Sequence, residues 1–105
     1  MVARAAFEKQ SWETWIVAMD VSDDLETGET IILATSTISA KDNNGDDATD
    51  DVLDQGGKAV SGSLLQIRVV AGSAALQPYW IRFRALTSND NKYELDVKMV
   101  IREKG

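Results

Sequence analysis

Asp42, Asn44 and Asp46 are the residues whose types and spacing come closest to a known chemistry. Oxygen ligands at the first, third and fifth positions of a loop are typical of calcium binding. The sixth position, however, is Asp47 where a calcium loop has glycine, and the twelfth is Leu53, so the bidentate carboxylate is missing. We therefore predict no metal here and keep these residues as weak candidates. The simpler interpretation is a solvated loop whose Asp and Asn side chains form turns.

Catalytic chemistry has little support in this sequence. The chain has no histidine and no cysteine, so a serine nucleophile would need a lysine or carboxylate base, and neither GxSxG nor SxxK occurs. Asp50 and Asp51 are adjacent in an acidic run, which more simply indicates a solubilising face than an acid/base pair. The segment QGGKAVSG lacks the preceding strand and following helix of a phosphate-binding loop. We predict a non-enzymatic protein that needs no cofactor.

The composition limits the partners that this protein can have. A chain of 105 residues with 44% hydrophobic and 27% charged residues is expected to fold as one globular domain, residues 1–105. The absence of cysteine favours folding in a reducing cytoplasm. A net charge of -6 opposes binding to nucleic acid or to anionic membranes. No signal peptide and no apolar run of membrane-spanning length is found, so the expected partners are proteins.

Alternation of apolar and polar residues predicts about seven short strands, separated by Gly, Asn and Asp turns, in an all-β, immunoglobulin-like antiparallel sandwich. Strands are expected in 15–22, in 30–40 with Ile32, Ala34 and Ile38 on one face, and in 59–72 with a bulge or bend at Gly62. Segment 41–57 is expected to be a long surface loop, with room for one short strand or helical turn. The predicted core is Trp15, Val17, Met19, Leu65, Ile67, Val69, Ile81, Phe83, Leu95, Val97 and Met99.

The two ends of the chain give different signals. Residues 1–12 could form a flexible N-terminal arm, because they show helical propensity but no face that would pack. At the other end, PYWIRFRALTSNDNKYELDVKMVIRE places two alternating runs on either side of a polar turn. A hairpin centred near Asp90 would place Arg84 opposite Asp96 and Trp80 opposite Val100.

Two stretches of the chain resemble small tailed-phage virion proteins of the fiber-tail adaptor type. MDVSDDLETGETI is similar to their opening block, and the C-terminal hairpin, with its tyrosine-bearing strand and Thr-Ser before the turn, is similar to their closing pattern. The middle of the chain departs from the family, because the expected Gly-Gly before the tyrosine strand appears only as AGSAALQPY. The resemblance implies an immunoglobulin-like structural or adaptor protein of a phage or prophage. Such a protein would be made in the host bacterial cytoplasm and then built into the virion tail.

The outward face of the hairpin carries Trp80, Arg82 and Arg84, and this is the composition of a protein interface. We predict contact with another virion or tail protein, or with a second copy in a homo-oligomer. Two alternatives remain open at this stage. Trp80 could instead be covered by the N-terminal arm through Phe7 or Trp12. The tryptophans could also stack sugars in a carbohydrate- or surface-binding module, and a calcium-dependent module is less favoured.

Overall fold

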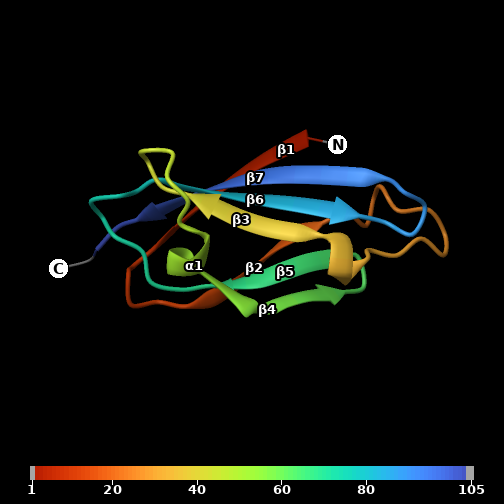
Figure 1. Ribbon diagram of the computed structural model, residues 1–105, viewed down its shortest axis with the longest axis horizontal. Helices are drawn as coiled ribbons and strands as arrows, with labels where there is room; N and C mark the ends of the chain where they lie inside the picture. Colours follow the sequence, from red (N-terminus) through yellow and green to blue (C-terminus); the bar gives the residue numbers. More distant parts are fainter. Residues whose placement is uncertain (1, 104–105) are drawn as a thin grey trace.

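The computed structural model describes residues 2–103, with side chains from Ala6 onward. Its strands form two sheets, in the orders β1-β7-β6-β3 and β2-β5-β4, and this confirms the predicted all-β sandwich (Figure 1). Among the described residues no helix has the length and apolar character needed to cross a bilayer. The elements are β1 (Val2–Lys9), β2 (Trp15–Asp20), the 3-10 helix η1 (Leu33–Thr35), β3 (Thr37–Lys41), α1 (Thr49–Val52), β4 (Leu53–Ser61), β5 (Leu64–Val69), β6 (Tyr79–Leu86) and β7 (Lys92–Ile101).

The core lies between the two sheets and contains most of the residues that the alternation predicts. Nine of the eleven predicted core residues are buried. The two exceptions are on β2: Val17 is half-buried, and Trp15 is 37% exposed with its ring 6.0 Å from that of Phe7. Trp15 begins an edge strand, so only part of its surface meets the opposite sheet. The buried nine are Met19, Leu65, Ile67, Val69, Ile81, Phe83, Leu95, Val97 and Met99.

The N-terminal segment is a strand where the sequence suggested a flexible arm. β1 pairs with β7 from Val2 to Lys9, and the two strands run parallel, so the first sheet is not wholly antiparallel as expected. Phe7 packs against the core, and Lys9 is buried with its Nζ donating to the carbonyl oxygen of Gln10 (2.7 Å). The partner of β1 is the far edge of the last strand, which local periodicity cannot reveal.

Three further segments differ from their predicted structure. The strand expected over 30–40 is divided: Ser36 Oγ donates to the carbonyl oxygen of Ile32 (2.7 Å), a 3-10 turn forms, and only Thr37–Lys41 is extended. Ile32 and Ala34 are consequently exposed. The run 59–72 is a hairpin of β4 and β5 in which Gly62, at φ +58°, lies in the turn. The long loop expected over 41–57 is shortened by α1 and by the start of β4.

The β6–β7 hairpin is closed one residue earlier than predicted. Thr87 N–H donates to the carbonyl oxygen of Asn91 (2.9 Å), so the turn is centred at Asn89. Arg84 is therefore opposite Glu94 rather than Asp96, and Trp80 is opposite Lys98 rather than Val100. Because the shift is two residues in register, every side chain keeps its predicted face.

A polar cluster, in which Glu29 and Thr87 are buried and Asn91 is exposed, joins this hairpin to the turn after β2. The Glu29 carboxylate, only 6% exposed, accepts hydrogen bonds from Thr87 Oγ1, from Asn91 Nδ2 (2.8 Å) and from the Glu26 N–H (2.9 Å). Backbone bonds continue the connection, with Ser88 N–H donating to the carbonyl oxygen of Thr30 (2.8 Å). We call Glu29, Thr87 and Asn91 the latch. It links two segments that are distant in the sequence, LETGETI and LTSNDN.

Removing the Phe83 ring tests the core. Phe83 is fully buried at the centre of β6, so Phe83→Ala should lower the free energy of unfolding by about 3–5 kcal/mol. Chemical denaturation measures this, with Arg84→Ala as the control on the neighbouring exposed position, for which we expect a change below about 1 kcal/mol. A loss for Phe83→Ala as small as that of the control would contradict this packing.

Acid should weaken the latch. Hydrogen bonds from Thr87, Glu26 and Asn91 lower the pKa of Glu29 below its ordinary value of 4.5. The charged form is thus favoured in the folded state, and the resulting stability is present above about pH 4.5 and is lost as the pH falls through the folded-state pKa. We expect the difference in free energy of unfolding between wild type and Glu29→Gln to be largest at neutral pH and to shrink in acid. A difference that stays constant between pH 7 and pH 2.5 would show that Glu29 is not the titrating group.

Candidate protein-binding face

The outward face of the sheet β1-β7-β6-β3 presents its side chains in rows across the strands. Strand register places Trp80 on β6 between Lys41 on β3 and Lys98 on β7. The next row contains Arg82 opposite Asp96. Trp80, the second residue of β6, is 40% exposed although it is paired on both sides, with β3 and β7. The structure therefore holds an aromatic ring on a face that is mostly polar, with Val100 as an apolar neighbour on β7.

The arginines of this face are held by ion pairs with β7. Arg82 donates through Nε to Asp96 Oδ1 (2.9 Å) and through a second nitrogen to Oδ2 (3.2 Å), and Arg84 Nε donates to Glu94 Oε1 (2.7 Å). The hydrogen bond and charge of Asp96 raise the pKa of Arg82 above its usual range. All four side chains are about one third to three fifths exposed, so each pair stabilises the fold by only tenths of a kcal/mol. Their main effect is to orient the guanidinium groups.

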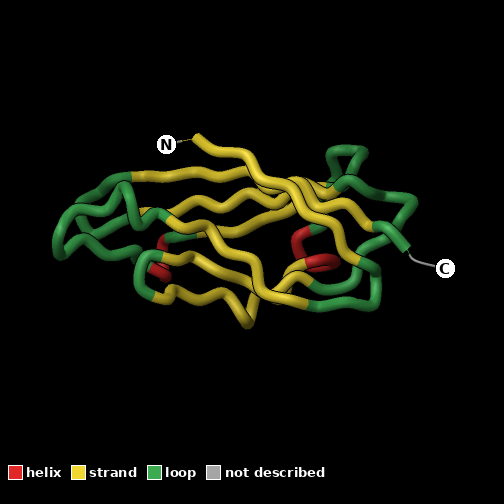
Figure 2. The backbone as a smooth tube through the Cα atoms, turned by 180° about the vertical axis from the view of Figure 1, so that it is seen from behind, coloured by secondary structure: helices red, strands yellow, loops and turns green. Residues whose placement is uncertain are grey.

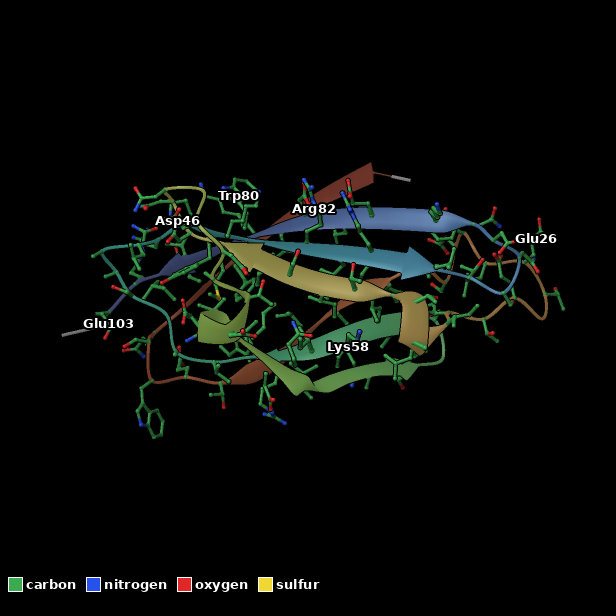
Figure 3. All side chains as sticks on the ribbon, in the orientation of Figure 1. Glu26, Asp46, Lys58, Trp80, Arg82 and Glu103 are labelled. Carbon is green, nitrogen blue, oxygen red and sulfur yellow. The ribbon has the colours of Figure 1, made fainter. Side chains whose placement is uncertain are left out.

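A cleft of about 590 Å³ separates β6 from the turn that follows β3. Trp80 and Arg82 form part of one wall, and Lys41, Asp42 and Asn43 form part of the other. Figure 3 shows Trp80 and Arg82 on the same side of the molecule as the turn that carries Asp46. We call this the Trp80 cleft.

Arg84 is not part of the Trp80 cleft. It lines a separate depression of about 540 Å³ with Thr37, Tyr93 and Glu94. The structure therefore brings together two of the three predicted interface residues, Trp80 and Arg82. Arg84 lies on the same face of the sheet as Trp80 and Arg82 but has different neighbours.

The turn that forms the far wall is fastened by side-chain hydrogen bonds. Asn43 Nδ2 donates to the carbonyl oxygens of Gln77 (3.0 Å) and Ala75 (3.3 Å), and Asn43 N–H donates to Leu76 (3.0 Å). Asn43 is not among the site residues predicted from the sequence. An asparagine in a polar turn is a weak signal, and its partners lie more than thirty residues away along the chain.

Asp42 has a structural role in this turn. Its Oδ1 accepts the N–H groups of Asn44 (2.9 Å) and Asp46 (3.1 Å), which is the hydrogen bonding of an Asx turn. Within residues 2–103, no group of three or more acidic, histidine or cysteine side chains is arranged to hold a metal ion. The one-three-five spacing of Asp42, Asn44 and Asp46 thus coincides with a hydrogen-bonded turn.

The proposed cover of Trp80 by the N-terminal segment is wrong. Phe7 packs toward the core and against Trp15, and Trp12 is 91% exposed. Neither Phe7, Trp12 nor Trp15 lines the Trp80 cleft. The three tryptophans therefore do not form one continuous aromatic platform, and the exposure of Trp80 is not relieved by the N-terminus.

Comparison with known proteins gives no further indication of identity: no family model matches this chain, and no curated protein matches it at a significant level.

Calcium should leave the stability of the protein unchanged. A ligand that binds only the folded state raises the melting temperature, but Asp42 already accepts two backbone hydrogen bonds in the turn. We expect less than about a one-degree difference between millimolar calcium and millimolar magnesium, measured by calorimetry. A rise of several degrees with calcium alone, lost in Asp46→Asn, would establish a site at this turn.

Proposed function

We propose that this protein is a non-enzymatic adaptor of a tailed phage or prophage particle, and that it joins tail components through the outward face of the β1-β7-β6-β3 sheet. The observation that carries the proposal is the Trp80 cleft. A partly exposed tryptophan lies beside an arginine that a bidentate ion pair orients, and the opposite wall is fastened by Asn43. Tryptophan and arginine are the residues that most often dominate binding at protein interfaces.

Rigidity makes this face suited to a structural joint. Trp80 is on a strand that is paired on both sides, with β3 and β7. A preorganised aromatic side chain loses little conformational freedom when a partner covers it, so more of the contact energy is available for binding. The net charge of -6 keeps the free subunit soluble before assembly.

The assignment to phage particles rests on the sequence resemblance. Its support from the fold is that the two resembling blocks meet in the latch, through Glu29 and Thr87.

An immunoglobulin-like topology forms part of the proposal. The orders β3-β6-β7 and β2-β5-β4 follow the C-F-G and B-E-D strands of that fold. Tyr79 begins β6 and its hydroxyl accepts the N–H of Ser73 (2.9 Å), as in the tyrosine corner.

A carbohydrate-binding module remains the second candidate, because Trp80 lines a cleft with polar walls. Two of the polar side chains that could contact a sugar, Asp42 and Asn43, already hydrogen-bond to the backbone. We therefore favour a protein partner, either another tail protein or a second copy in the particle. On this proposal the protein is made in the host cytoplasm and then becomes part of the virion tail.

Replacement of Trp80 tests the proposed function. Trp80→Ala should change the free energy of unfolding by less than about 1 kcal/mol, since the ring is substantially exposed. In a complementation assay of the encoding phage or prophage, the variant should give far fewer assembled particles by electron microscopy. Leu33→Ala is the matched control, because Leu33 is also 40% exposed and is not part of the Trp80 cleft.

Two outcomes would contradict this proposal. Normal assembly with Trp80→Ala would remove the cleft from the interface. A stability loss of about 3 kcal/mol or more would show that Trp80 acts within the fold. Binding of oligosaccharides that is lost in Trp80→Ala, with normal assembly, would favour the carbohydrate-binding alternative.

A further inference from the structure

The free edge of β2 is a second exposed surface, separate from the Trp80 cleft. β2 is the last strand of the sheet β2-β5-β4, and within residues 2–103 it pairs only with β5. Figure 2 views the molecule from the side on which β1 and β2 lie. In a constant-type immunoglobulin sandwich the first strand lies beside the second. Here β1 pairs with β7 in the other sheet, so no described strand fills the position beside β2.

The ladder between β2 and β5 shows which backbone groups face this edge. Val21 N–H donates to the carbonyl oxygen of Ser63 (3.0 Å), so these residues are opposite each other at a hydrogen-bonded position. Hydrogen-bonded positions alternate along an antiparallel pair. Because the register is unbroken, the backbone N–H and C=O groups of Met19 and Val17 therefore also point toward β5. The N–H and C=O groups of the intervening residues, 16 and 18, point to the free edge.

The edge strand β3 is protected in a way that β2 is not. Ala40 N–H donates to Thr49 Oγ1 (3.0 Å), and Gln55 Nε2 donates to the carbonyl oxygen of Ile38 (2.9 Å). The backbone groups of β3 that face away from β6 are thus bound by α1 and β4. This is one of the means by which natural proteins prevent unwanted strand pairing.

The edge strand β4 is protected by an irregularity. Its register with β5 breaks between Asp54 and Ala59, and this segment contains two glycines and a lysine. A bulge and a charged residue both discourage a further strand. β2 has no bulge, because its pairing is continuous from Trp15 to Asp20, and its one charged residue, Asp20, is at its last position.

Apolar side chains accompany the free edge. Ile16 is 52% exposed, Trp15 is 37% exposed, and Trp12, in the turn before β2, is 91% exposed. An edge strand with free backbone groups and exposed apolar side chains is a ready template for another strand. Trp12, Trp15 and Ile16 would also lose water contact when such a strand binds.

We propose that the free edge of β2 binds an extended segment of a partner protein as an additional strand, in the manner of β-strand addition. Charge defines the chemistry of that segment. Glu13 and Asp20 lie near the two ends of β2, so we expect the segment to carry a basic residue at each end. Its alternate residues are apolar, because they would pack beside the exposed Trp15 and Ile16. A second copy of this chain fits poorly, because antiparallel pairing of two β2 strands brings the Glu13 end of one copy to the Asp20 end of the other.

Hydrogen exchange of the free protein tests the geometry of the edge. The amide protons of Ile16 and Ala18 should exchange at least about tenfold faster than those of Val17 and Met19, which are bonded to β5. Nuclear magnetic resonance can follow the four amides separately. Equal protection of all four would overturn the proposal, because it would mean that the edge is already covered.

Binding of a defined peptide tests the occupant. The probe is Lys-Thr-Val-Thr-Val-Thr-Val-Thr-Lys, and its binding should shift the amide resonances of Ile16 and Ala18 and slow their exchange. The same peptide with glutamate at both ends should bind at least about tenfold more weakly at low salt. A twin in which every amide is N-methylated should not bind, because it can donate no backbone hydrogen bond through either of its edges. No binding of the lysine peptide, or equal affinity of the lysine and glutamate peptides, contradicts the proposed occupant.

A pair of variants isolates the backbone bond. Ala18→Pro removes an N–H that is not used within the sheet, so the variant should fold and lose the peptide, whereas Ala18→Val keeps the N–H and should bind it. Trp80→Ala should bind the peptide normally, because Trp80 lies on the other sheet. A negative result with the peptide would therefore contradict the proposal for β2 and leave the proposed function of the Trp80 cleft unaffected. Retained binding by a folded Ala18→Pro variant overturns the proposal. The proposal is also overturned if light scattering shows a wild-type dimer and an Ala18→Pro monomer, because the occupant of the edge would then be a second copy.

Discussion

The position of Thr87 determines how the outward face of this protein is assembled. Its hydroxyl donates to the buried carboxylate of Glu29 and accepts the N–H groups of Asn89 (3.3 Å) and Asn91 (3.2 Å). Ile31 forms an isolated bridge with Thr87, so the turn after β2 is attached at the same place. These contacts set the residue at which β6 ends and the chain turns into β7. Burying the side chains of Glu29 and Thr87 without such partners would cost free energy.

The register that follows from this turn places every group of the proposed interface. Arg82 comes opposite Asp96, where a bidentate pair can form, and Trp80 comes opposite Lys98. The far wall of the Trp80 cleft depends on a different connection, between Asn43 and the loop that precedes β6. The Trp80 cleft and the free edge of β2 belong to opposite sheets. On our proposals the protein therefore has two separate contact surfaces, as a joint between two other components requires.

Much of this architecture could be predicted from the sequence because a strand has a side-chain period of two. The faces of β6 and β7 were predicted correctly although the register was wrong, since an error of two residues leaves Trp80 and Phe83 on their own sides. The location of β1 could not be predicted, because its partner is a strand some ninety residues away and is joined by parallel pairing. The exposure of Trp15 likewise depends on its place at a sheet edge, and the role of Asn43 depends on partners that only the folded chain brings near.

Site-specific photocrosslinking can show whether Trp80 contacts a neighbouring protein in the assembled particle. Benzoylphenylalanine is introduced at position 80 and, as a control of equal exposure, at position 33; assembled particles are then irradiated, and crosslinked products are identified by mass spectrometry. We expect a crosslink from position 80 to another virion protein or to a second copy, and none of comparable yield from position 33. Particles that form normally and give no crosslink from position 80 would contradict it.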